Sequence, residues 1–237
     1  MIDAYFHLCL EEADPLTDLQ LRLRQANLDG AIVVETWAGE ERSFLERLSD
    51  ERVRVIWCWR GSPASPALSV LDREHTLGLR FRTADLPHAK PVLERIASQG
   101  KVALVHAEAG IGPLVEQVER VIAVHPRLRV YVPHLGWPAR EGKADPAWPA
   151  AVRRLVALPR VTFGVSAACA FTAEPFPHAD VRDLALTAIQ VFDPSRLVAA
   201  TNYPHLDRAR FADYWTLAVN WILSIHSAWR HPDDVFA

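Results

Sequence analysis

The sequence has few cysteines and no long hydrophobic run, and each shortage excludes a class of protein. Only three cysteines occur among 237 residues, Cys9, Cys58 and Cys169. They provide neither a C-x-x-C pair for a zinc–thiolate site nor an even set for a disulfide framework, so we interpret them as buried thiols in a reducing compartment. The longest apolar stretches have the length of a strand, well below the ~20 residues that cross a bilayer.

The sequence has no dense basic segment, and we expect no export signal. Its 26 Lys and Arg residues against 29 Asp and Glu residues leave a formal net charge of -3, which disfavours a nucleic-acid partner. Met1 is followed directly by Ile2 and Asp3, without the positive and apolar regions of a signal peptide. We therefore expect a cytoplasmic protein that binds a small-molecule substrate and has no nucleic-acid or membrane partner.

Hydrophobic periodicity divides the chain into alternating strands and helices. Short runs rich in β-branched residues alternate with longer amphipathic stretches from one end to the other. The short runs predict eight strands, at residues 2–8, 31–36, 53–59, 77–82, 102–107, 129–134, 161–166 and 197–202. The amphipathic stretches predict eight helices, at residues 16–26, 40–48, 67–73, 88–99, 113–124, 146–158, 181–191 and 207–229.

Eight strands and eight crossover helices in a chain of this length favour a closed parallel barrel. The alternative is a doubly wound open sheet, which usually has fewer strands and an early glycine-rich phosphate loop, but no G-x-G-x-x-G follows any strand here. We predict an α/β fold, a single (β/α)8 TIM barrel over residues 1–237, with the helix at 207–229 covering the barrel. Eight tryptophans leave open a homo-oligomeric interface.

Polar residues interrupt the apolar runs at the carboxyl ends of the predicted strands, where a TIM barrel carries its active site. Three of them are histidines, His7, His106 and His134, at the ends of the first, fifth and sixth strands. Imidazoles at a common mouth can hold a divalent metal or exchange protons near neutral pH, and the alternative is hydrogen bonding within a polar layer. Other candidates at this mouth are Tyr5, Trp59, Arg80, Glu108, Asn202 and, on the rim, His205.

Four segments between residues 1 and 205 carry motifs that occur together in one known family. They read MIDAYFH at 1–7, VHAEAG at 105–110, PHLGWP at 133–138 and FDPSRLVAATNYPH at 192–205. In order and rough spacing they resemble the strand-one Ile-Asp-x-His-x-His motif, the histidine motifs of strands five and six, and the strand-eight Ser-Asp-x-Pro motif of the amidohydrolase superfamily. The resemblance is to its amidohydrolase-related branch of lactonases and decarboxylases, and it implies a barrel enzyme.

Two positions depart from the family pattern. Tyr5 stands where the family has the first histidine of the H-x-H pair, and Asn202 stands where it has an aspartate that serves as metal ligand and proton acceptor. A neutral phenol and an amide are weak metal donors and poor bases. What remains is a three-histidine set, His7, His106 and His134, which is able to hold one zinc ion with an open position, although a site without metal is almost equally expected.

A route without metal is also implied, because some lactonases of this family work without one. The segment Leu77-Gly-Leu-Arg80 resembles the family's strand-four Gly-x-Arg, which implies that Arg80 binds an anion or stabilises an oxyanion. The alternative is that Arg80 pairs with a barrel carboxylate, Glu35 or Glu108.

The catalytic roles follow from the same resemblance. Tyr5 would polarise a carbonyl group, and Asn202 would orient a water molecule that His7 or His134 deprotonates. The remaining candidates are expected to line the substrate site: Arg80, Trp59, Glu108 and His205.

Three functions remain open. The first is a lactonase-like hydrolase that cleaves a C–O or C–N bond of a small carbonyl substrate with weak or no metal dependence. The second is a metal-dependent nonoxidative decarboxylase of the same branch. The third is a catalytically inactive barrel that binds a ligand or a protein, which the replacements at Tyr5 and Asn202 suggest.

Overall fold

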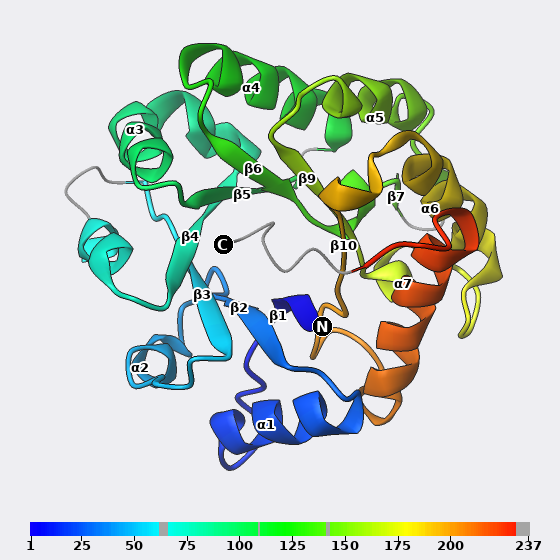
Figure 1. The fold of residues 1–237 in the computed structure, drawn as a ribbon, viewed down its shortest axis with the longest axis horizontal. Helices are drawn as coiled ribbons and strands as arrows, with labels where there is room; N and C mark the ends of the chain where they lie inside the picture. The colour runs from blue at the N-terminus through cyan, green and yellow to red at the C-terminus, as the bar shows by residue number, and fades with distance from the viewer. Residues whose placement is uncertain (62–65, 109, 141–142, 231–237) are drawn as a thin grey trace.

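A computed structural model describes residues 1–61, 66–108, 110–140 and 143–230 of the chain. Within them, eight parallel strands form one sheet in the order β1-β2-β3-β4-β5-β6-β9-β10, with helices around its outside (Figure 1). The strands are β1 Ile2–Phe6, β2 Gly30–Val34, β3 Val53–Cys58, β4 Thr76–Arg82, β5 Val102–His106, β6 Arg129–Val132, β9 Val161–Val165 and β10 Leu197–Ala199. All eight lie where the periodicity predicts strands.

The sheet closes into a barrel where its first and last strands meet. Phe6 pairs in parallel with Tyr203, and the His7 N–H donates to the Tyr203 carbonyl oxygen at 2.7 Å. The buried Asp3 carboxylate strengthens this seam, because it accepts the Thr201 N–H at 3.0 Å and the Thr201 hydroxyl at 2.5 Å. The result is the predicted TIM barrel, nearly closed.

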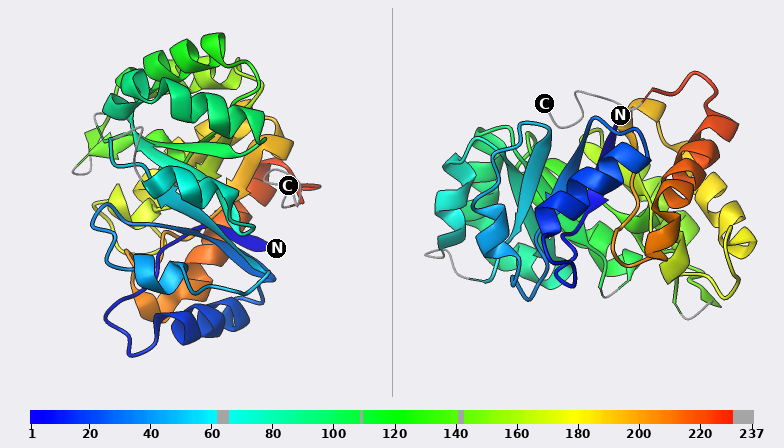
Figure 2. Two further views of the ribbon diagram at one scale, coloured as in Figure 1. Left: turned by 90° about the vertical axis from the view of Figure 1, so that its left-hand side faces the viewer. Right: turned by 90° about the horizontal axis from the view of Figure 1, so that it is seen from below.

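The helices pack outside the strands, and three of them differ from prediction. The predicted helix at 40–48 is reduced to the four-residue α2 Arg42–Leu45. The segment at 67–73 is a 3-10 helix, η1 Pro66–Asp72, and the predicted helix at 207–229 consists of the 3-10 turn η6 Arg208–Arg210 and the shorter α7. α7 packs against α6, α1 and β10, and Figure 2 shows α1 and α7 side by side on the outer surface. The α-helices are α1 Pro15–Gln25, α2 Arg42–Leu45, α3 Lys90–Ser98, α4 Ile111–Val124, α5 Trp148–Val156, α6 Ala179–Val191 and α7 Phe211–Ile225.

Side chains alternate between the barrel interior and the layer under the helices, as the period of two requires, except in β1, where the register shifts between Asp3 and Phe6. In β4, Leu79 and Phe81 belong to the outer layer, so Arg80 between them faces the interior. In β3, Trp57 belongs to the outer layer and Ile56 to the interior. The interior cluster consists of Ala4, Tyr5, Ile32, Val34, Ile56, Leu77, Val102, Leu104, Tyr131, Val198 and Ala200.

The burial of the cysteines agrees only in part with the expectation. All three cysteines are free thiols; Cys9 and Cys58 are buried, but Cys169 is partly exposed, contrary to the expectation of burial. No helix in the described part of the chain combines the length and the apolar character needed to cross a membrane.

Candidate active site

Aromatic and imidazole rings meet at the carboxyl ends of β1, β5 and β6. The Tyr5 ring lies 5.1 Å from the His7 ring and 4.3 Å from the His134 ring, measured between centroids. The His134 ring lies 5.6 Å from that of His106, and the His7 ring lies 5.3 Å from that of His205 on the rim. The structure thus brings the three predicted histidines, Tyr5 and His205 together, and we call these five side chains the mouth cluster.

The protonation state of His7 follows from its contacts. Its Nδ1 faces the Val34 carbonyl oxygen, which can only accept, so Nδ1 carries the proton and Nε2 carries the lone pair. Burial lowers the pKa of His7 well below its usual value, and the charge of Arg80 lowers it further. His7 is therefore a neutral imidazole whose Nε2 is an acceptor.

Left-handed backbone conformations occur where the chain leaves β6 and β10. His134, Leu135 and Trp137 have φ angles of 57°, 53° and 62°, and Asn202 has a φ angle of 68°. Such angles are uncommon outside glycine, are best tolerated by asparagine and aspartate, and concentrate at functional sites. The strained turn after β6 directs His134 inward, where its Nδ1 lies 2.9 Å from the hydroxyl of Ser166 at the end of β9.

Arg80 is a buried cation without a carboxylate partner among the described residues, with only 5% of its surface exposed. Its Nη1 donates to the backbone carbonyl oxygen of Glu35 at 3.2 Å, and its guanidinium lies 4.3 Å from the Trp37 ring centroid. The same guanidinium lies 5.9 Å from the Tyr5 ring centroid. Two residues earlier in β4, Gly78 allows close packing against β5, because a Cβ there would lie 1.9 Å from the Val102 carbonyl oxygen.

The Glu35 carboxylate is engaged elsewhere. It accepts two hydrogen bonds of 2.8 Å from Arg42 and one of 3.1 Å from Arg60. The alternative in which Arg80 pairs with the Glu35 carboxylate is therefore wrong. The positive charge of Arg80 remains directed at the mouth cluster.

Three buried polar atoms in this region have no hydrogen-bond partner in the described ranges: the Tyr5 hydroxyl, the Arg80 Nε and the His106 Nδ1. Buried polar groups are nearly always satisfied by protein or by ordered water, so three such atoms in neighbouring side chains indicate a place for a polar molecule. Burial raises the pKa of Tyr5 to about 12, which keeps its phenol a hydrogen-bond donor.

Burial and the charge of Arg80 both lower the pKa values of the imidazoles in the mouth cluster. Burial is the main reason why the pKa of His106 falls to about 3, and it also lowers the pKa values of His134 and His205. The charge of Arg80 contributes to the lowering for each of these imidazoles. The mouth therefore combines neutral imidazoles with a single positive charge, which suits an anionic group.

Comparison with known proteins identifies the family to which the chain belongs. A family model described as amidohydrolase matches residues 36–231. The chain belongs to the amidohydrolase family. This confirms the resemblance of the sequence motifs, although the match does not include β1 with Tyr5 and His7. No protein of curated function matches the sequence.

Solved amidohydrolases and their relatives share the fold at low sequence identity. An apo structure from Agrobacterium tumefaciens is 18% identical, covering 99% of this chain and 94% of that chain, with a TM-score of 0.75. A putative 2-pyrone-4,6-dicarboxylic acid hydrolase from Pseudomonas putida is 19% identical over 93% and 89%, with a TM-score of 0.72. An amidohydrolase from Burkholderia multivorans with bound zinc is 20% identical over 94% and 91%, with a TM-score of 0.70.

The donor set of this amidohydrolase does not fit a metal ion. Across the described residues there is no group of three or more His, Cys, Asp or Glu side chains placed to hold one, so the predicted zinc site at His7, His106 and His134 is not found. The Tyr5 phenol lies in ring contact with both His7 and His134, where a family member has a histidine ligand. Arg80 adds a positive charge beside it, which opposes a second cation.

Two predicted substrate contacts lie outside the mouth cluster. Trp59 is buried in the outer layer, with its ring 5.6 Å from that of Phe81, because strand alternation turns it away from the interior. Glu108 lies beyond the end of β5, is exposed, and accepts the Thr83 N–H at 3.3 Å. Their prediction as residues that line the mouth is therefore not supported by their placement.

Two tryptophans near the cluster were missed by the sequence analysis. The Trp137 ring lies 5.1 Å from the His106 ring, and the Trp37 ring centroid lies 4.3 Å from the guanidinium of Arg80 and 4.7 Å from that of Arg82. Both tryptophans follow strand ends by a few residues, in the loops after β2 and β6. This position in the sequence could have identified them as residues near the mouth. Asn202 is buried beside the seam, and its backbone N–H donates to the Tyr5 carbonyl oxygen at 3.0 Å.

Proposed function

We propose that this amidohydrolase hydrolyses a small lactone-like substrate that carries a carboxylate, with weak or no dependence on a metal ion. The observation that carries the proposal is the buried guanidinium of Arg80 near the ring of Tyr5, whose hydroxyl has no hydrogen-bond partner in the described part of the chain. A cation and a neutral hydrogen-bond donor next to neutral imidazoles match the anionic group, the carbonyl oxygen and the attacking water of such a reaction. The Pseudomonas putida relative, named for a dicarboxylic acid, supports an acidic substrate.

Arg80 binds the substrate carboxylate in this proposal. The Glu35 carbonyl oxygen and the Trp37 ring hold the guanidinium in place, so the anion meets a fixed donor fork. The arriving negative charge offsets the charge of Arg80, which is one cause of the lowered pKa of His7. Substrate binding therefore makes the His7 imidazole a stronger base.

The chemical step moves one proton through His7. Its Nε2 accepts a proton from water, and the resulting hydroxide oxygen forms a bond to the lactone carbonyl carbon. Tyr5 donates a hydrogen bond to the developing oxyanion. The tetrahedral intermediate then breaks the ring C–O bond, and the leaving oxygen takes the proton from the His7 imidazolium. The proposal gives Asn202 the role of orienting the water, while His134 and His106 provide further polar contacts.

A substrate panel tests the proposal. Small lactones with and without carboxylates, the corresponding amides, and aromatic carboxylic acids are offered to the purified chain, with and without a metal chelator. We expect ring opening of carboxylated lactones that the chelator leaves unchanged. Carbon dioxide release that requires added zinc would instead identify a decarboxylase, and binding without turnover would identify an inactive barrel.

A further inference from the structure

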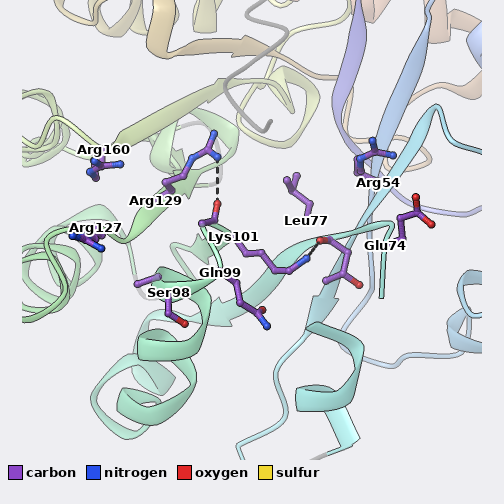
Figure 3. A pocket seen from close by; sticks show the side chains of 12 residues that line it. Arg54, Glu74, Leu77, Ser98, Gln99, Lys101, Arg127, Arg129 and Arg160 are labelled. Carbon is purple, nitrogen blue, oxygen red and sulfur yellow. Dashed lines mark hydrogen bonds between the residues drawn. The ribbon is translucent and has the colours of Figure 1, made fainter. Parts of the chain in front are cut away.

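A cavity of ≈ 690 Å³ lies at the end of the barrel opposite the mouth cluster. Residues at or just before the amino ends of the strands line it, among them Arg54 in β3, Thr76 in β4, Lys101 before β5 and Arg129 in β6. Figure 3 shows Arg127 and Arg160 on one side of this cavity, Arg54 and Glu74 on the other, and Lys101 extending between them. We call it the basal cavity.

The basal cavity concentrates positive charge in a chain whose net charge is -3. Its lining contains five cationic side chains and one carboxylate, that of Glu74: the cations are Arg54, Lys101, Arg127, Arg129 and Arg160. Clustered charges of one sign in a recess create a strong local potential that attracts an ion of opposite charge.

Four of the five cations have no ion pair among the described residues. Arg54 donates to the Glu51 carbonyl oxygen at 2.8 Å, and the Lys101 ammonium donates to the Thr76 carbonyl oxygen. Counting described residues alone, Arg54, Lys101, Arg127 and Arg160 form no ion pair. Burial lowers the pKa of Lys101, and the nearby charge of Arg54 contributes to that lowering.

We propose that the basal cavity binds a small oligophosphate. Arginine forks match the geometry of phosphate oxygens, and four of the five cations are arginines. The cations come from the starts of four different strands and the loops before them, so a chain of phosphate groups engages more of them than one phosphate does. The volume of the cavity accommodates several such groups.

The basal cavity is separate from the mouth cluster, so its ligand is assayed by binding and by stability rather than by turnover. A ligand that binds only the folded chain raises its melting temperature by mass action. For a chain of this size, tripolyphosphate at about 100 times its Kd would raise Tm by roughly 5–10 °C.

Isothermal titration calorimetry with inorganic tripolyphosphate, at about 150 mM salt, tests the proposal. The double variant Arg127→Ala, Arg160→Ala and, separately, Arg54→Ala are each expected to weaken binding by about tenfold or more. The matched control Arg24→Ala, Arg153→Ala removes two exposed helical arginines and leaves the affinity unchanged. Inorganic phosphate binds more weakly than tripolyphosphate.

Melting temperatures without ligand distinguish a loss of binding from misfolding of the variants. Without ligand, the cavity variants are expected to melt at or above the temperature of the unmodified chain, because mutual repulsion is relieved, and this excludes misfolding as the cause of weak binding. The proposal is overturned by equal affinity in the unmodified chain and the cavity variants, by equal loss of affinity in the control variant, or by no binding at this salt concentration.

Discussion

The two ends of the barrel both present cations, but in opposite ways. At the mouth the buried guanidinium of Arg80 is held by a carbonyl oxygen and an indole ring. Nearby buried polar atoms have no hydrogen-bond partner within the ranges that the structure describes. At the base five cations surround a wide cavity, and Arg54, Arg127 and Arg160 are exposed. Burial strengthens a charge by excluding water, whereas exposure leaves it to salt screening. The mouth is therefore suited to chemistry and the base to reversible binding of charge.

The largest effect is expected from removing one hydroxyl at the mouth. Tyr5→Phe deletes the proposed donor to the oxyanion, and the loss of such a donor lowers kcat by about 10²–10³. Because this hydroxyl has no hydrogen-bond partner among the described residues, the free energy of unfolding is expected to change little.

Tyr214→Phe is the matched control for that variant. The Tyr214 hydroxyl, on α7 outside the barrel, lies 3.1 Å from Nε2 of the buried His178. Its removal is expected to cost about 1 kcal/mol of stability and to leave kcat intact. Loss of kcat in both variants, or in neither, would contradict the role of Tyr5.

A slightly smaller effect is expected from neutralising the mouth cation. Arg80→Gln removes charge-assisted hydrogen bonds to the substrate carboxylate, so KM for a carboxylated lactone is expected to rise by about 10–100-fold. A lactone without a carboxylate loses much less. Steady-state kinetics on the two substrates checks this, with Arg24→Gln on the exposed face of α1 as the control. An equal loss for both substrates would show that Arg80 does not bind the carboxylate.

The seam beside the mouth makes stability depend on pH. Burial raises the pKa of Asp3 from 3.8 to about 7, against the opposing effect of its hydrogen bonds with Thr201 and Tyr5. Between about pH 4 and pH 7 the folded chain holds a proton on Asp3 that the unfolded chain does not. This favours folding at low pH and is lost as the pH rises through 7.

Asp3→Asn tests the seam directly. The neutral amide removes this titration, so the unmodified chain is expected to lose about 1 kcal/mol or more relative to the variant between pH 5 and pH 8. Urea unfolding at both pH values measures it, with the exposed Asp213→Asn as the control. A difference that is independent of pH would contradict the raised pKa of Asp3.

The smallest expected effect is a change in KM on replacing a tryptophan at the mouth, compared with one in the outer layer. Trp37→Leu removes the ring that lies against Arg80 and is expected to raise KM several-fold, the scale of a cation–π contact. Trp59→Leu, in the outer layer, is expected to lower stability and leave KM within about twofold. Kinetics and melting curves on both variants decide it, and a larger KM change at Trp59 would contradict the placement.

Features that depend on periodicity and strand topology were predicted correctly, and features that depend on loops or on the exact strand register were not. The eight strands and the convergence of His7, His106 and His134 follow from periodicity and from the rule that parallel strands end at one rim. Trp59 was misplaced because a shift of one residue along a strand reverses the face that a side chain occupies. Trp37 was missed because its contact with Arg80 depends on the path of a loop.

The metal site and the basal cavity show that sequence spacing does not reveal which distant side chains converge in space. Residue types suggested a three-histidine site, but holding a metal requires convergence within about 2 Å of one point, which spacing in sequence does not encode. The basal cations are spread from residue 54 to residue 160, with no dense run. Only the closed barrel brings the starts of their strands together.

The proposed chemistry depends on neutral imidazoles beside the charge of Arg80 at the mouth. The most direct test is nitrogen NMR of the histidine side chains across pH, with and without a small dicarboxylate, in the unmodified chain and in Arg80→Gln. We predict that His7 and His106 stay neutral well below pH 6 without ligand, and that their pKa values rise on dicarboxylate binding or in Arg80→Gln. Protonation near the usual pKa of 6.5 in the free chain, unchanged by the anion or by the substitution, would contradict the account.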